Sequence, residues 1–561
     1  MFMRPRPQAL KCLLPALAVL VALMGCAREP QVPGVEPTLR RLTEQQYRNV
    51  IADLFGPHIV VAGTFYPIQR NDGLIAIGAG DATVSALSFE KYEKLAHSIA
   101  EQVVDEGNRG LYMRCQPAQP NGPDDACAKE FLEPVGRLLF RRPLSESELA
   151  QTIGLSASAA EALGSFHDGL AFGLASLLVS PNFLFIVDDV QPVEGATGDG
   201  EVELTAFAKA SRLSFFLWNT SPDSELLDAA QRGDLSTAKG LDAQITRMMS
   251  SSRLRDGVRG FFADMLRLEE FEHLEKDNLI YPAFDPEARE DTKEQLLRTI
   301  EYQLLEEGGD YRGLFSTRKT FINGALGPIY RAPVAEPDIW TEYELSDQEG
   351  RVGIQALAGF IALHSHPGRS SPTIRGKAVR EILLCQSIPE PPGDVDFSLF
   401  VSTAGKQTAR NRLKIHNAAA ACAGCHKLTD GIGLSLENFD GAGQFRTTDD
   451  GLAIDASGKL DGIEYQDQEG FSKALADNPA IPICLVEQLF SYSLGRSGRR
   501  EDKDWLSFLI EQFADDGYRL QPLMRSIAAS PNFLAVTGAG DVHDSETQLG
   551  HLTLTDKAGP Q

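Results

Sequence analysis

The stretch TLRRLTEQQYRNVIADLFG (residues 38–56) decides how the chain is expected to fold, because it has the marks of a helix at its start and along one face. Thr43 can cap the helix, and Gln46 stands three residues later, which is the spacing of a capping box. Apolar side chains then recur at helical intervals and form one stripe. These side chains belong to Leu42, Tyr47, Val50, Ile51, Leu54 and Phe55. The stretch therefore predicts an amphipathic helix that packs on a core.

Similar patterns recur along the chain and predict a mainly α protein. Residues 88–107 read as a helix that ends at Gly107, and Ser145 with Glu148 predicts a capping box at the start of another helix. Strand signals are few, and residues 450–467 predict one short β-hairpin. The chain has 561 residues, which is too many for one core. We therefore expect a multidomain helical array with a short β-hairpin in its C-terminal part.

The pentapeptide SPNFL occurs twice, at residues 180–184 and 530–534. Each copy follows a helix of small residues, and each comes downstream of a pair of arginines. Two ordinary helix-ending turns would account for the copies, but their matched context favours a duplicated helical unit.

Changes in composition divide the chain into successive segments. Residues 1–25 read as a signal peptide and residues 26–37 as a tether. Five helical domains are expected to follow, and residues 539–561 are expected to be a disordered tail. The expected domains span residues 38–112, 113–190, 203–335, 350–465 and 466–538.

The N-terminus indicates where the protein is sent. A basic start precedes an almost wholly apolar run, residues 12–24, which is too short to span a bilayer as a stable helix. The run ends in Gly25-Cys26, which resembles a bacterial lipobox, in which the cysteine thiol takes a diacylglycerol. An ordinary signal peptide or a short anchor is the alternative. We expect a lipid-anchored protein of the cell envelope that faces the periplasm or the cell surface.

The charge of the chain excludes one class of partner. The formal net charge is −25, from 53 basic and 78 acidic residues. A chain this acidic repels phosphate backbones, so nucleic acid is not an expected partner. A partner protein is expected to be neutral or basic.

Once Cys26 is set aside for the lipid, the cysteines outside the signal fall into pairs, as in an oxidising compartment. Cys115 and Cys127 flank a loop rich in Pro, Gly and Asp and predict a disulfide. For Cys385 and Cys484 the sequence leaves two possibilities open, a second disulfide or two buried thiols.

The last pair belongs to a CxxCH motif, Cys422-x-x-Cys425-His426. In c-type cytochromes two thiols on one helical turn attach to the haem vinyls, and the adjacent histidine lies beneath the iron. A structural zinc site would need a fourth ligand, and a redox-active CxxC would need a thioredoxin-like context. We expect one covalent haem c per chain.

Other residues could complete a haem site. Leu434, Leu436, Phe439 and Phe445 could wall an apolar crevice or simply pack in a core. Arg446 is expected to bind a propionate. For the sixth iron position the candidates are His416 and Met524, with His364 and His366 behind them.

Taken together, these stretches make the chain resemble the planctomycete and myxobacterial multidomain extracytoplasmic proteins of unknown function that carry a cytochrome-c-like CxxCH. The resemblance rests on RRLTEQQYRNVIADLFG, LLFRRPLSESEL with SLLVSPNFLF, LTAFAKASRLSFFLWNTSPDSELLDAAQRGDL, SSPTIRGKAVREILLCQSIPEPP, HNAAAACAGCHKLTDGIGLSLENFDGAGQFR, LVEQLFSYSLGR and FADDGYRLQPLMRSIAASPNFL. Family members usually have Asp-Pro after the CxxCH, whereas this chain has Asp430-Gly431. Glycine there predicts a looser loop beneath the haem.

The sequence thus favours a monohaem c-type cytochrome lipoprotein that passes electrons to a redox partner. The alternatives are a haem-dependent peroxidase- or oxidase-like enzyme and a non-haem structural or binding lipoprotein. Classical hydrolase and transferase motifs are absent from the sequence: it has no HExxH, no GxSxG and no Walker spacing around Gly376-Lys377.

Overall fold

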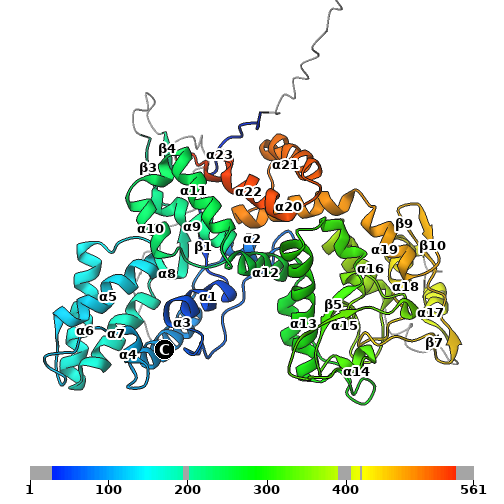
Figure 1. The fold of residues 1–561 in the computed structure, drawn as a ribbon, viewed down its shortest axis with the longest axis horizontal. Helices are drawn as coiled ribbons and strands as arrows, with labels where there is room; N and C mark the ends of the chain where they lie inside the picture. Colours follow the sequence, from blue (N-terminus) through cyan, green and yellow to red (C-terminus); the bar gives the residue numbers. More distant parts are fainter. Residues whose placement is uncertain (1–27, 194–200, 390–405, 417–419, 539–561) are drawn as a thin grey trace, which may run out of the picture.

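Figure 1 shows the fold in a computed structural model, which describes residues 28–193, 201–389, 406–416 and 420–538. Helices dominate, and each β-sheet in these ranges has two antiparallel strands. The prediction of a mainly α fold is therefore confirmed. Among the described helices none is long and apolar enough to cross a membrane. The predicted signal peptide, Cys26 and the predicted tail lie outside the described residues.

The N-terminal lobe, drawn in blue and cyan in Figure 1, has a hydrophobic core of its own. Its first helix begins after Thr43, and both hydrogen bonds of the predicted capping box with Gln46 are present. Ser145 and Glu148 make the same box at a later helix of the lobe. The elements are β1 (Leu39–Arg41), α1 (Glu44–Phe55), α2 (Ile75–Asp81), α3 (Ala86–Val104), α4 (Arg109–Tyr112), α5 (Asp125–Phe140), α6 (Glu146–Leu163), α7 (Phe166–Leu178), α8 (Pro181–Leu184) and β2 (Phe185–Val187).

A second and larger core takes in α2 and extends from α9 to the C-terminal helices. In Figure 1 its first part, drawn mostly in green, runs from the helices next to the N-terminal lobe into the right-hand side of the molecule. The elements of this part are β3 (Val190–Pro192), β4 (Val202–Leu204), α9 (Ala206–Leu217), α10 (Ser224–Gln231), η1 (Asp234–Ser236), α11 (Ala238–Met249), α12 (Leu254–Met265), η2 (Leu268–His273), α13 (Pro286–Glu301), η3 (Tyr302–Glu306), η4 (Tyr311–Phe315), β5 (Lys319–Ile322), α14 (Gly327–Tyr330), β6 (Thr341–Glu344), η5 (Asp347–Glu349) and η6 (Ile354–Ala356).

The remaining elements form the region of the CxxCH motif and the C-terminal helices. Residues 448–465 form two successive β-hairpins, where the sequence predicts one. The elements are α15 (Ala358–Leu363), α16 (Pro372–Ala378), η7 (Val379–Leu383), α17 (Ala409–His416), α18 (Ala420–Leu434), β7 (Thr448–Asp449), β8 (Leu452–Ala453), β9 (Gly458–Leu460), β10 (Ile463–Tyr465), α19 (Gln468–Ala476), α20 (Ala480–Leu494), η9 (Arg500–Asp502), α21 (Lys503–Asp515), α22 (Leu520–Ala529) and α23 (Pro531–Leu534).

The two SPNFL copies form the short helices α8 and α23, and in each the serine hydroxyl caps the helix. A buried arginine holds each copy. Arg141 donates to the carbonyl of Phe183 at 3.2 Å, and Arg212 donates to the carbonyl of Phe533 at 2.7 Å. The two copies thus share local structure as well as sequence.

Residues 28–37, for which the sequence predicts a tether, are held along α23. The Val32 amide donates to the Asn532 side chain at 3.1 Å, and Val35 forms a parallel bridge with Val536. Arg499 donates to the Pro33 carbonyl at 3.0 Å. The start of the described chain is therefore fixed to the C-terminal helices.

Two disulfides join the cysteine pairs that the sequence analysis singles out. Cys115 and Cys127 close a short loop before α5, with their Cα atoms 5.6 Å apart. Cys385 and Cys484 join the segment after η7 to α20, across a sequence separation of 99 residues. The second bond encloses the whole CxxCH region.

Candidate functional site

The CxxCH motif lies near the start of α18. Cys422 and Cys425 are three residues apart on this helix, a spacing that places both on one face, and His426 follows directly. Of the cysteines only the backbone is described; their side chains, and that of His416 at the end of α17, lie outside the described parts of the chain. The backbone therefore gives the position of the motif on α18. Of the two cysteines and the histidine, only His426 has a side chain that the structure describes.

His426 is held by a carboxylate four residues further along α18. Its Nδ1 lies 2.9 and 3.0 Å from the two carboxylate oxygens of Asp430. The two side chains are only 15% and 7% exposed, so the bond is largely shielded from water. An ionised carboxylate only accepts hydrogen bonds, so this contact favours the neutral tautomer with its proton on Nδ1 and its lone pair on Nε2. This tautomer is the one in which Nε2 can bind a metal.

A second helix orients the carboxylate. The Thr373 hydroxyl, at the start of α16, donates to Asp430 Oδ1 at 2.9 Å and lies 3.4 Å from His426 Nδ1. The Thr373 hydroxyl, the Asp430 carboxylate and the His426 imidazole thus form one series of hydrogen bonds. Such outer contacts fix the orientation of a metal-binding histidine and raise its basicity.

Glycines bring the two helices close enough for this contact. A Cβ at Gly376 of α16 would lie 1.9 Å from the carbonyl oxygen of Thr429, and a Cβ at Gly433 of α18 would lie 1.7 Å from that of Pro372. Neither position has room for a larger residue. The backbones of α16 and α18 therefore meet directly, which is why Thr373 reaches Asp430.

The region after the motif is ordered by packing. Gly431, for which the sequence predicts a looser loop, lies inside α18, and its carbonyl accepts a hydrogen bond from Tyr465 at 3.1 Å. A Cβ at Gly458 of β9 would lie 2.2 Å from the same carbonyl oxygen. The prediction of a loose loop is wrong, because α18 continues through this point and the second hairpin packs against it.

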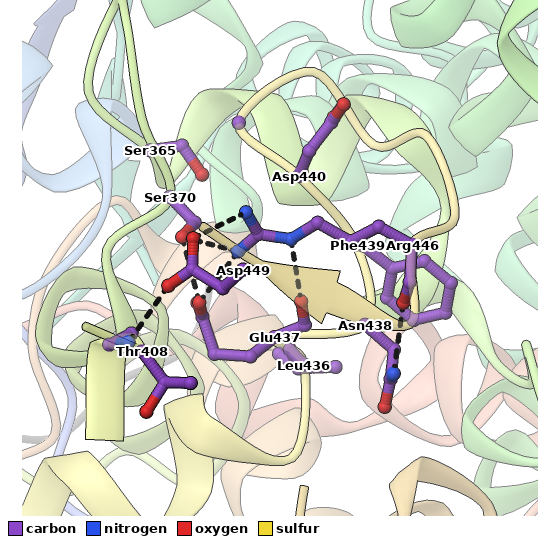
Figure 2. A network of polar contacts seen from close by, with 12 residues as sticks. Ser365, Ser370, Thr408, Leu436, Glu437, Asn438, Phe439, Asp440, Arg446 and Asp449 are labelled. Atoms are coloured by element: carbon purple, nitrogen blue, oxygen red, sulfur yellow. Dashed lines mark hydrogen bonds and ion pairs between the residues drawn. The ribbon is translucent and has the colours of Figure 1, made fainter. Parts of the chain in front are cut away.

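Arg446 lies at the centre of a buried ionic network, shown in Figure 2. Its guanidinium is 2.8 Å from Glu437 Oε2, 3.0 Å from the Ser370 hydroxyl and 3.2 Å from Asp449 Oδ1. Asp449 in turn accepts from the backbone amide of Ala409, the first residue of α17, at 2.9 Å. Arg446 therefore supports the start of the helix that ends at His416. Propionate binding by Arg446 stays a prediction.

The apolar residues after the motif lie in the core. Leu434, Leu436 and Phe439 are almost fully buried, and Phe445 packs against the same core. The ring of Phe439 lies 4.1 Å beneath the guanidinium of Arg351. Of the two roles the sequence allows, packing in the core is the one these contacts favour.

The other candidate iron ligands are spread over the fold. Met524 is buried in α22, which lies apart from α18 in Figure 1, so the structure does not bring this sulfur to His426. His364 caps the end of α15 and stacks edge-on against Phe360, and burial lowers its pKa to about 3. His416 is on the helix that packs beside α18.

Two residues of the site escaped the sequence analysis. Asp430 could have been found from the sequence, because a carboxylate four residues after a histidine lies on the same face of a helix. The sequence analysis named Asp430 only as a neighbour of Gly431. Thr373 carries no such signal, since it is 57 residues from Asp430 in the chain.

Five family models match successive parts of the chain, each described as a protein of unknown function. They are DUF1587 at residues 40–105, DUF1595 at 127–188, DUF1592 at 204–331, DUF1588 at 351–449 and DUF1585 at 461–533. No curated protein and no solved structure matches significantly. The DUF1588 model, whose short name PSCyt3 indicates a cytochrome-c-like family, covers α15 to α18 and with them His426. The chain thus matches five successive domain models of unknown function, the fourth of them cytochrome-like by name.

Proposed function

We propose that the protein is a cell-envelope lipoprotein that holds one covalent haem c and transfers electrons. Cys422 and Cys425 would form the thioethers, and His426 would be the proximal ligand. The observation that carries the proposal is the hydrogen bond from His426 Nδ1 to Asp430, because it places the lone pair of a neutral imidazole on Nε2, directly after the cysteines of a CxxCH motif.

The donor set fits this cofactor. Two thiols one helical turn apart and an adjacent imidazole are the groups that covalent attachment and axial ligation require. When bound, the haem supplies a one-electron redox centre. The chain itself orients the imidazole through Asp430 and fixes Asp430 through Thr373. His416, at the end of α17, is the candidate for the sixth position.

The same hydrogen bond favours a second candidate, a haem-dependent peroxidase- or oxidase-like enzyme. A carboxylate acceptor raises the basicity of the histidine, and an electron-rich proximal ligand favours cleavage of an O–O bond. Binding of carbon monoxide or cyanide separates the two candidates. A six-coordinate electron-transfer site resists both ligands, whereas an open site binds them.

The surroundings of the N-terminus support an orientation at the membrane. Glu29 accepts hydrogen bonds from Ser530 and Asn532, and it is three residues from Cys26, a span of at most about 10 Å. A lipid on Cys26 would therefore hold the α23 end of the molecule at the membrane surface. The redox partner would be a neutral or basic protein, because this chain is strongly acidic.

The test is a pyridine haemochrome spectrum of the protein made together with cytochrome c maturation factors. The wild type should show a c-type spectrum that survives extraction with acidic acetone, and the double variant Cys422→Ala with Cys425→Ala should lose it. The matched control, Cys115→Ala with Cys127→Ala, removes two cysteines from the other lobe and should keep it. Absence of a Soret band in the wild type would refute the haem proposal and leave a structural or binding lipoprotein.

A further inference from the structure

Arg40, in β1, is a buried cation that no described carboxylate contacts directly. The residue is 8% exposed, and no hydrogen bond or ion pair links its guanidinium to any part of the chain that the structure describes. Its Nε is fully enclosed. Burial, together with the nearby charge of Arg212, lowers the pKa of Arg40, and the carboxylate of Asp188 offsets only part of this effect. An unpaired charge in a protein interior is strongly unfavourable unless something compensates it.

The nearest carboxylate is already committed. Asp188 receives two hydrogen bonds from Arg212, at 2.8 and 2.7 Å, and two more from Thr38. These four bonds use both oxygens of the carboxylate. Asp188 is therefore hydrogen-bonded to Arg212 and acts on Arg40 only through space, so one carboxylate serves two guanidinium groups.

The next residue adds a second cation. Arg41 is 2% exposed, and its terminal nitrogens donate to neutral carbonyls, those of Thr83 at 3.1 Å and Tyr66 at 2.9 Å among them. Its Nε is also buried and has no partner among the described residues. Arg40 and Arg212 thus face a single carboxylate, and Arg41 places a further buried cation at the next position of β1.

Arg40 and Arg41 both line a small cavity of about 20 Å³. The cavity lies where β1 and α1 meet α9 and α20, and Phe216 and Tyr492 contribute to its walls. None of the side chains that line it is acidic. A water molecule needs about 10–15 Å³ measured in this way, so the space fits one particle of water or monatomic-ion size and excludes sulfate, phosphate and carboxylic acids.

We propose that this cavity binds one monatomic anion, chloride in ordinary solution. The anion is the missing counter-ion of Arg40 and Arg41, and guanidinium N–H groups are its donors. It ties together four separately matched domains, because the walls include residues 40–46, Ile186, residues 215–216 and residues 492–493. The site is independent of the proposed haem.

Thermal unfolding of the full mature chain at constant ionic strength tests the proposal. Replacing sodium gluconate by sodium chloride or bromide, up to 100 mM, should raise the Tm by about 1–3 °C along a saturating curve. Arg40→Met should abolish this rise, and in gluconate it should melt no lower than the wild type, since the buried charge is gone. Arg232→Met, which removes an arginine whose side chain is 58% exposed, is the control and should keep the full response.

A crystal grown in bromide gives a direct answer that does not depend on any variant. The expected result is an anomalous bromide peak beside Arg40. The proposal fails if water occupies the cavity in that crystal, if all salts give the same Tm, or if Arg40→Met responds to chloride as the wild type does.

Discussion

Gly433→Ala should open the contact that holds the His426 site. The added Cβ would lie 1.7 Å from the Pro372 carbonyl oxygen. Non-bonded heavy atoms need about 3.5 Å, so α16 must move away from α18 by roughly 1.5–2 Å. A shift of this size breaks the 2.9 Å bond from Thr373 to Asp430.

The expected cost follows from three contributions. Overpacking costs about 1–3 kcal/mol, and the lost hydrogen bond to a charged group costs about 1.5–3 kcal/mol. Alanine in a helix recovers about 1 kcal/mol relative to glycine. The net destabilisation of the contact is therefore about 2–5 kcal/mol.

Hydrogen exchange read by mass spectrometry measures this cost locally. Amides of α16 and α18 should exchange at least about 30-fold faster in Gly433→Ala, since 1.4 kcal/mol corresponds to a factor of ten. Gly424→Ala is the matched control on the same helix, where an added Cβ meets no described atom within 4 Å, and it should slow exchange slightly. Equal protection in the two variants would show that the close approach does not hold the site together.

Three further changes test other parts of the account. Asp430→Asn should keep the covalent haem but raise its reduction potential by on the order of 60 mV, because His426 becomes a weaker donor; an unchanged potential in a redox titration would contradict this. Burial opposes ionisation of Asp188, but the hydrogen bonds from Arg212 outweigh it and lower the pKa of Asp188 to about 2. The contribution of ionised Asp188 to the stability of the fold is thus complete above about pH 4 and is lost as the pH falls towards 2. Asp188→Asn should lower the free energy of unfolding in urea at pH 7 by about 3–5 kcal/mol, and this free energy should then fall less steeply with decreasing pH than in the wild type. A variant whose stability falls with pH as steeply as that of the wild type would contradict this. Cys26→Ala should leave the protein uncleaved or in the aqueous phase on detergent partitioning, and an unaltered partition would argue against lipidation.

Local signals in the sequence predict local structure well. The capping boxes at Thr43 and Ser145 depend on residues three positions apart, so the sequence contains all that they need. The second hairpin also has a local signal that the sequence analysis did not use. Asp-Gly occurs twice in residues 450–467, and both pairs turn with positive φ, at Gly451 and Gly462. Each pair marks one hairpin.

The parts that the sequence does not predict depend on contacts between distant segments. Strands of three residues, such as β1, are too short to show an alternating pattern, and β1 forms because its partner β2 lies nearby in the fold. Thr373 joins His426 only because glycines let α16 and α18 touch. Gly431 reads as a flexible point, but Tyr465 and β9 hold it inside a helix. In each case tertiary packing, rather than the local preference of the sequence, determines the structure.

The disulfide between Cys385 and Cys484 also determines what a cut in the backbone does. Every peptide bond between these two cysteines lies inside one covalent ring, so hydrolysis of any one of them leaves both fragments attached. A nicked molecule would migrate as the intact chain until a reductant separates it. The ring also passes through the CxxCH motif. If the protein carries the proposed haem, Cys422 and Cys425 must stay reduced for its attachment while Cys385 and Cys484 are oxidised. The order of these two reactions would then determine whether Cys422 and Cys425 bind the proposed cofactor or form a wrong disulfide.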